Sequence, residues 1–135
     1  MDEDELECAF YDLLDEHDCM PHELMWTTMD GQRMPVGEMS SRHLAASIIY
    51  AVRRKVTTDA NVDSLREQID QFPAHEDDYT HHLADEERSS EQLSITIYVL
   101  TKEQKRRAAK EQRLTISPRM ARLRKRLAEL PGNSQ

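Results

Sequence analysis

The chain has 135 residues, of which 38% are hydrophobic and 33% are charged, and its formal net charge is −8. This length suits one domain, and the low apolar share predicts a small core that self-association would enlarge. No run of about 18 apolar residues is present, which argues against a membrane-spanning segment.

The charge is divided unevenly along the chain. Residues 1–100 carry 23 acidic and 7 basic side chains, whereas residues 101–135 carry 3 acidic and 11 basic ones. Such a division indicates electrostatic steering or a charged partner. A second interpretation, equally open, is that acidic and basic helices pack against each other within one fold or across a homodimer.

Residues 2–18 are expected to form an acidic helix. Leu6, Phe10 and Leu13 recur at spacings of three and four, which predicts one apolar stripe with carboxylates on the other side. Pro21 prevents its continuation. The acidic start lacks the basic and apolar pattern of a secretory signal, so we expect a cytoplasmic protein.

Residues 24–36 are expected to form a β-hairpin around Asp30 and Gly31. An Asp-Gly pair readily takes the positive φ values of a two-residue type I′ turn. In such a hairpin, Trp26 and Met34 can pair across the two strands.

The next segment, residues 40–55, predicts the core helix, with Ser40 as its N-cap. A shorter amphipathic helix is expected over residues 62–72, because Pro73 ends its apolar pattern. Residues 74–92 are rich in acids and poor in apolar side chains, which predicts an exposed acidic loop.

The run of β-branched residues at 94–100 favours a strand, which would add a third strand to the hairpin. Two basic helices are expected over residues 102–130, with Ser117 and Pro118 starting the second one, and residues 131–135 are expected to be a disordered tail. The predicted fold is therefore a mainly helical α+β domain of residues 1–130. In it, a small antiparallel hairpin packs on four to five helices.

Part of the hairpin carries a resemblance to a protein family. The pattern Trp-x-Thr-x-Asp-Gly, then Met-Pro-Val-x-Glu-Met and His-Leu, covers about 20 residues and resembles small bacteriophage and prophage accessory proteins. Its members here are Trp26, Thr28, Asp30, Gly31, Met34, Pro35, Val36, Glu38, Met39, His43 and Leu44. The resemblance implies an accessory role in the host cytoplasm, such as inhibition of a nucleic-acid enzyme or defence complex, and implies no catalytic residues.

Four residues of the types that bind zinc lie within fifteen positions near the N-terminus. They are Cys8, His17, Cys19 and His22. Zinc favours such nitrogen and sulfur donors in tetrahedral sites, but the spacing lacks a Cys-x-x-Cys knuckle. The favoured interpretation is a buried Cys8 with the other three exposed, and hence no bound metal.

Two charged surfaces are the candidate binding sites. The first is acidic, and we expect it to bind a basic host protein by imitating a phosphate backbone. The second is a basic and apolar helix face, suited to assembly or to nucleic acid. The acidic residues are Asp2, Glu3, Asp4, Glu5, Asp12, Asp15, Glu16, Asp77, Asp78, Asp85, Glu86 and Glu87, and those of the second surface are Arg119, Arg122, Leu123, Arg126, Leu127 and Leu130.

No sequence motif of a metalloprotease, hydrolase or nucleotide-binding enzyme is present, and we expect neither catalysis nor a cofactor. The leading hypothesis is a phage-type binding protein that acts through its acidic surface. The alternatives are a nucleic-acid-associated protein that uses its basic helices and a small zinc-binding protein.

Overall fold

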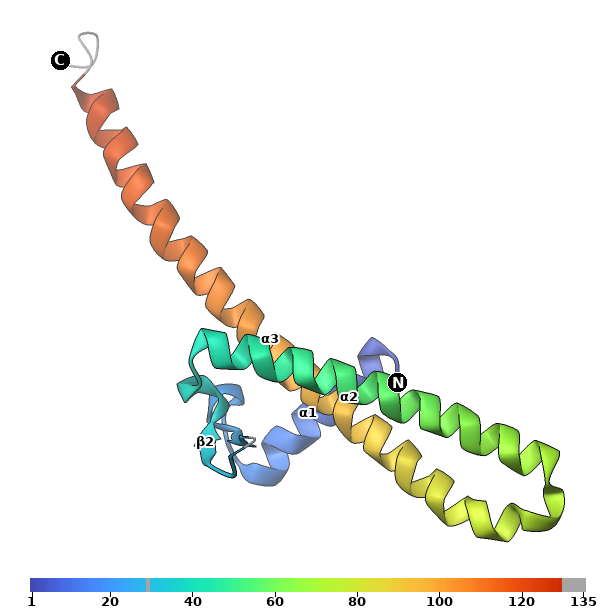
Figure 1. The fold of residues 1–135 in the computed structure, drawn as a ribbon. Helices are drawn as coiled ribbons and strands as arrows, with labels where there is room; N and C mark the ends of the chain where they lie inside the picture. Colours follow the sequence, from blue (N-terminus) through green and yellow to red (C-terminus); the bar gives the residue numbers. More distant parts are fainter. Residues whose placement is uncertain (29, 130–135) are drawn as a thin grey trace. The chain divides into compact units, whose positions relative to one another are not determined.

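The computed structural model describes residues 1–28 and 30–129, apart from the side chains of residues 114–118 and 121. The described residues form three α-helices, three short 3₁₀ turns and one two-stranded antiparallel sheet (Figure 1). The predicted class, a mainly helical α+β fold with a small hairpin, is confirmed. The chain divides into two compact units, residues 1–103 and residues 104–135.

Helix α1 (Glu3–His17) begins and ends at acidic caps. The Asp2 side chain accepts a hydrogen bond from the amide of Glu5 at 2.8 Å, which satisfies a donor that the helix leaves open. At the other end, Asp18 takes a left-handed conformation with φ of 47°, and its amide bonds to carbonyls of the last turn. The 3₁₀ turn η1 (Pro21–Glu23) follows.

The hairpin pairs β1 (Met25–Thr27) with β2 (Arg33–Pro35), and Trp26 lies opposite Met34 as predicted. The loop, however, is not the predicted two-residue turn. The Thr28 amide donates to the Gln32 carbonyl at 2.8 Å, so the turn lies between these two residues. Gly31 has φ of +83°, a left-handed conformation that glycine adopts readily.

The Thr28 side chain explains the longer loop. Its buried hydroxyl donates to the Asp30 carboxylate at 2.7 Å and accepts from the Gln32 amide at 3.1 Å. The hydrogen bond that the Thr28 hydroxyl donates to Asp30 lowers the pKa of the Asp30 carboxyl below its usual value. The strands lead into the 3₁₀ turn η2 (Val36–Glu38), which lies against η1.

Helix α2 (Ser41–Gln71) joins the two helices predicted over 40–55 and 62–72 into one. Ser40 caps it, as predicted, by accepting from the His43 amide at 3.1 Å. No glycine or proline interrupts it, and its buried Ala51, Thr58 and Val62 recur at helical spacing. It ends at Phe72, before the 3₁₀ turn η3 (Pro73–His75).

Helix α3 (Glu76–Ala128) replaces several predicted elements. The expected acidic loop at 74–92, the expected third strand at 94–100 and the expected division of the basic segment into two helices are wrong, because one helix runs from Glu76 to Ala128. Acidic residues in the first turn complement the positive end of the helix dipole. Leu130 and the expected tail at 131–135 lie outside the described residues.

The core of residues 1–103 is formed by residues of α1, α2 and α3 and of the segments beside the hairpin. α2 and the first part of α3 lie side by side and antiparallel (Figure 1), and α1 and the hairpin pack where α2 begins. Val36, Leu44 and Leu100 have less than 2% of their surface exposed. The buried cluster consists of Phe10, Leu24, Val36, Met39, Leu44 and Leu100.

Candidate functional site

The outer face of α1 carries several of the acidic residues expected to meet a partner. Positions three and four apart lie on the same side of a helix. Asp4, Asp12, Asp15 and Glu16 therefore share the side away from Phe10, which is buried in the core. All four acidic side chains are exposed.

The carboxylates of α1 differ in how well they suit the helix. Glu3, Asp4 and Glu5 lie in the first turn, where the helix dipole favours negative charge. Asp15 and Glu16 lie in the last turn, where it disfavours negative charge. Within the part of the chain that the structure describes, none of the exposed carboxylates of α1 forms an ion pair.

The acidic residues of α3 are more fully paired. Asp77 is exposed in the first turn, and the other four members of the predicted set have basic neighbours within 4 Å, three of them on adjacent turns. The pairs are Asp78 with His75, Asp85 with Arg88, Glu86 with His82 and Glu87 with Arg66.

The predicted acidic residues lie on two helices, α1 and α3. Helix α1 meets α3 at Phe10 and Tyr98, whose ring centroids are 5.6 Å apart. The acidic residues predicted as one surface therefore come from two helices, and among the described residues the exposed carboxylates of α1 form no ion pair.

The four candidate zinc ligands do not meet. Among the described residues, no three His, Cys, Asp or Glu side chains are grouped so as to hold a metal ion. Cys8 is exposed, contrary to the expectation that it is buried, and Cys19 is half-buried against the core. His17 and Cys19 line one pocket, while His22 contacts Gly37.

The basic and apolar set lies on α3 within the unit of residues 104–135. Arg119, Arg122 and Arg126 are exposed. Leu123 and Leu127 have 53% and 54% of their surface exposed, which is unusual for leucine on a packed helix.

Lys102, one of the basic residues of α3, lies against two aromatic rings. Its Nζ lies 5.2 Å from the ring centroid of Tyr98 and 5.8 Å from that of Phe10. A hydrogen bond with Tyr98 raises the pKa of Lys102 above its usual value, and the nearby Glu7 carboxylate adds to this effect. Lys102 thus stabilises the contact between α1 and α3.

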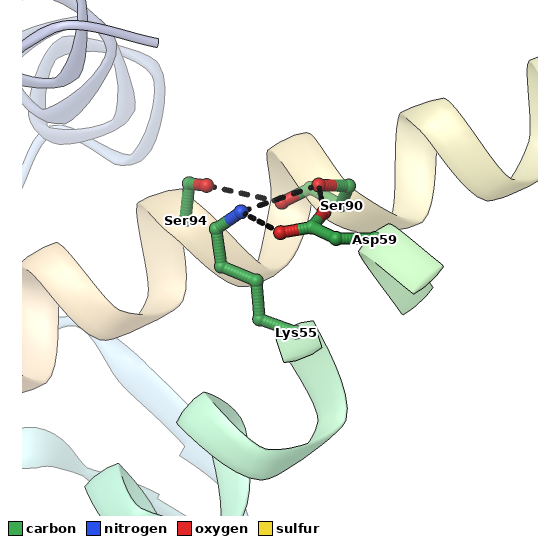
Figure 2. Close-up of polar contacts among 4 residues, drawn as sticks. All are labelled: Lys55, Asp59, Ser90 and Ser94. Atoms are coloured by element: carbon green, nitrogen blue, oxygen red, sulfur yellow. Dashed lines mark hydrogen bonds and ion pairs between the residues drawn. The ribbon is translucent and has the colours of Figure 1, made fainter. Parts of the chain in front are cut away.

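A polar cluster between α2 and α3 was not found from the sequence (Figure 2). Lys55 donates to Asp59 at 2.7 Å and to the hydroxyl of Ser90 at 3.4 Å. Ser90 donates to the other oxygen of Asp59 at 2.5 Å, and Ser94 donates to the Ser90 carbonyl at 3.2 Å. The cluster joins residues 31 and 35 positions apart, a separation that no local pattern reveals.

The geometry of this cluster suits a link between helices rather than a nucleophile. Hydrogen bonds from Lys55 and Ser90 lower the pKa of Asp59 below its usual value of 3.8. A carboxylate stabilised in this way is a weak base, so it does not activate the Ser90 hydroxyl. Lys55 is held in an ion pair with Asp59, with 2.7 Å between Nζ and the carboxylate oxygen.

We expect Asp59→Asn to lower the free energy of unfolding at neutral pH but to have little effect in acid. The folded carboxyl ionises more readily than the unfolded one, so its stabilisation is present above about pH 4 and is lost as the pH falls through the folded pKa. Urea unfolding at pH 7, 5 and 3 measures this. Asp63→Asn, exposed on the same helix, should change nothing; an equal loss at all three pH values would contradict the prediction.

Two pockets flank Trp26. The larger, of about 400 Å³, lies between the end of α1, the hairpin and α3, and its polar lining includes His17, Arg33 and Gln92. The smaller, of about 260 Å³, lies between the hairpin, α2 and α3. Trp26 and Thr96 line both pockets. No local sequence pattern predicts these pockets, because their walls come from separate elements.

No protein-family model matches the chain, and neither a curated protein nor a solved structure matches it. In the described part of the chain, no helix has both the length and the apolar character needed to cross a membrane.

Proposed function

We propose that this chain is a phage-type accessory protein that binds a basic host protein through the acidic face of α1 and thereby modulates or inhibits it. The observation that carries the proposal is the set of exposed carboxylates on this face, which form no ion pairs among the described residues. The set extends into the last turn at Asp15 and Glu16, where the helix dipole opposes it. Residues that break a local rule of stability are typical of functional sites.

The chemistry of the face indicates the class of partner. Carboxylates three and four positions apart have Cβ atoms about 5–6 Å apart and present a row of negative charge. Such a row complements a groove that evolved for a phosphate backbone, and charge complementarity of this kind speeds association and sets specificity. The partner is therefore a basic protein that handles nucleic acid. The resemblance of the hairpin to phage accessory proteins supports the host as its source.

We expect Asp15→Asn with Glu16→Gln to weaken partner binding and to raise thermal stability. Each substitution removes a charge that the helix dipole disfavours, which contributes about 0.3–1 kcal/mol. Capture on the immobilised full-length protein from an extract of the source cells, at low and physiological salt, measures binding. Thermal unfolding of the same variants measures stability.

The matched control is Asp77→Asn with Asp78→Asn, which makes the same charge change at the start of α3. Here the dipole favours the acids, so the control should lose stability and keep the partner. Equal capture by both double variants, or no specific partner at low salt, would rule out the proposal.

Association with nucleic acid through α3 is the second candidate function. It is favoured by five exposed basic side chains within eight positions: Arg119, Arg122, Arg124, Lys125 and Arg126. Salt-dependent binding of a duplex, lost on changing Arg122, Arg124 and Arg126 to Glu, would support it.

A further inference from the structure

A narrow row of exposed apolar side chains runs along α3 in the unit of residues 104–135. Met120, Leu123 and Leu127 have 47%, 53% and 54% of their surface exposed. Their spacing of three and four continues in the sequence to Ile116 and Leu130. This spacing is that of the a and d positions of a heptad, which form the seam of a coiled coil.

Arginines flank this row on both sides. With Met120 and Leu127 at a and Leu123 at d, Arg119 and Arg126 take g positions and Arg124 takes an e position. In a two-stranded coiled coil, the e and g residues lie beside the seam and select the partner by charge. Each of these arginines is exposed.

We propose that this row is the binding site for an acidic amphipathic helix of another protein, which pairs with it as a two-stranded coiled coil. The partner helix has apolar residues at a and d and Glu or Asp at e and g. The described residues of this unit form one helix with no second element, and an amphipathic helix gains most of its stability by packing its apolar face. Pairing would bury the three exposed apolar side chains.

A second copy of the chain does not supply this helix. In a parallel pair, Arg119 at g would face Arg124 at e of the other copy, and in an antiparallel pair each arginine would face an equivalent one. Like charges in these positions act against self-pairing. Helix α1 is acidic, but its apolar stripe is already used in the core around Phe10.

The narrow width of the row and the arginines beside it favour a protein helix over a membrane or a nucleic acid as the partner. A helix that lies in a membrane interface inserts a broad apolar face with bulky residues, whereas this row is one or two side chains wide and bordered by arginines. Phosphate binding would explain the arginines, but it would not explain the exposed leucines. The combination of both features suits an acidic coiled-coil partner.

The test uses the full-length chain and a synthetic helix of three heptads with Leu at a and d and Glu at e and g. We expect this peptide to bind at physiological salt in a fluorescence anisotropy assay, with a gain of helical circular dichroism. Leu123→Ala with Leu127→Ala keeps every charge and a strong helix former at both sites, and should weaken binding about tenfold or more. Arg119→Glu with Arg126→Glu should transfer the preference to a peptide with Lys at e and g.

Several results would overturn the proposal. They are failure of the Glu peptide to bind, equal binding of a shuffled peptide of the same composition, and a homodimer in sedimentation that the alanine variant abolishes. Tighter binding of a DNA duplex or anionic vesicles than of the peptide would also overturn it. These results do not bear on the acidic face of α1, which lies in the other unit and has the opposite charge, so the two proposals fail separately.

Discussion

Replacement of Leu44 by alanine is expected to lower the free energy of unfolding by about 2–5 kcal/mol. Leu44 has no exposed surface and lies in the buried cluster with residues from α1, the hairpin and α3. Alanine preserves the helix but leaves a cavity at the point where all these elements meet. Urea unfolding followed by far-UV circular dichroism measures the change.

Val56→Ala on the same helix is the matched control. Val56 has 66% of its surface exposed, and alanine is the better helix former, so this variant should stay within about 0.5 kcal/mol of the parent. A loss at Leu44 no larger than that at Val56 would show that the core is not assembled around α2.

The elements that were predictable from the sequence rest on local chemistry. Asp2 and Ser40 each accept a backbone hydrogen bond three residues ahead, as helix caps do. The Asp30–Gly31 pair marks the hairpin, and Gly31 provides the positive φ of its turn. The loop length was not predictable from this pair alone, because it depends on the hydroxyl of Thr28.

Contacts between distant residues account for the elements that the sequence did not reveal. Residues 94–100 are rich in β-branched side chains and favour a strand in isolation, yet in α3 they bring Tyr98 and Leu100 against the core. Burial overrides such weak local preferences. Residues 74–92 have few apolar side chains, and α2 supports them there through Arg66–Glu87 and the cluster at Ser90.

The candidate sites divide in the same way. The acidic face of α1 and the row of exposed apolar side chains on α3 follow from helical spacing. Their residues were therefore predictable from the sequence alone. The ion pairs of the acidic residues of α3 were only partly predictable. Asp85 and Glu86 have basic neighbours on their own helix, whereas Glu87 pairs with Arg66 on α2. The pockets beside Trp26 and the cluster of Lys55 and Asp59 likewise depend on the packing of separate elements.

Gly37→Ala is expected to destabilise the fold by about 1–3 kcal/mol or more, because η1 and η2 pack too closely for a side chain. A Cβ atom at residue 37 would lie 2.9 Å from both the Cβ and the carbonyl oxygen of His22. The carbonyl is part of the main chain and the Cβ is fixed to it, so the clash is relieved only if η1 and η2 move apart. Thermal unfolding should show a fall of several degrees, since 1 kcal/mol corresponds to about 4–8 °C for a unit of this size.

Gly31 is the informative comparison, because its backbone conformation, and not a close contact, favours glycine there. A Cβ at Gly31 would meet nothing within 4 Å, but φ of +83° favours glycine or asparagine. Gly31→Asn should therefore be tolerated with only a small loss of stability. Gly37→Asn should destabilise the fold at least as much as Gly37→Ala does. If Gly31→Asn lowers the unfolding temperature more than Gly37→Asn does, the close contact between η1 and η2 is not what holds the hairpin against α2.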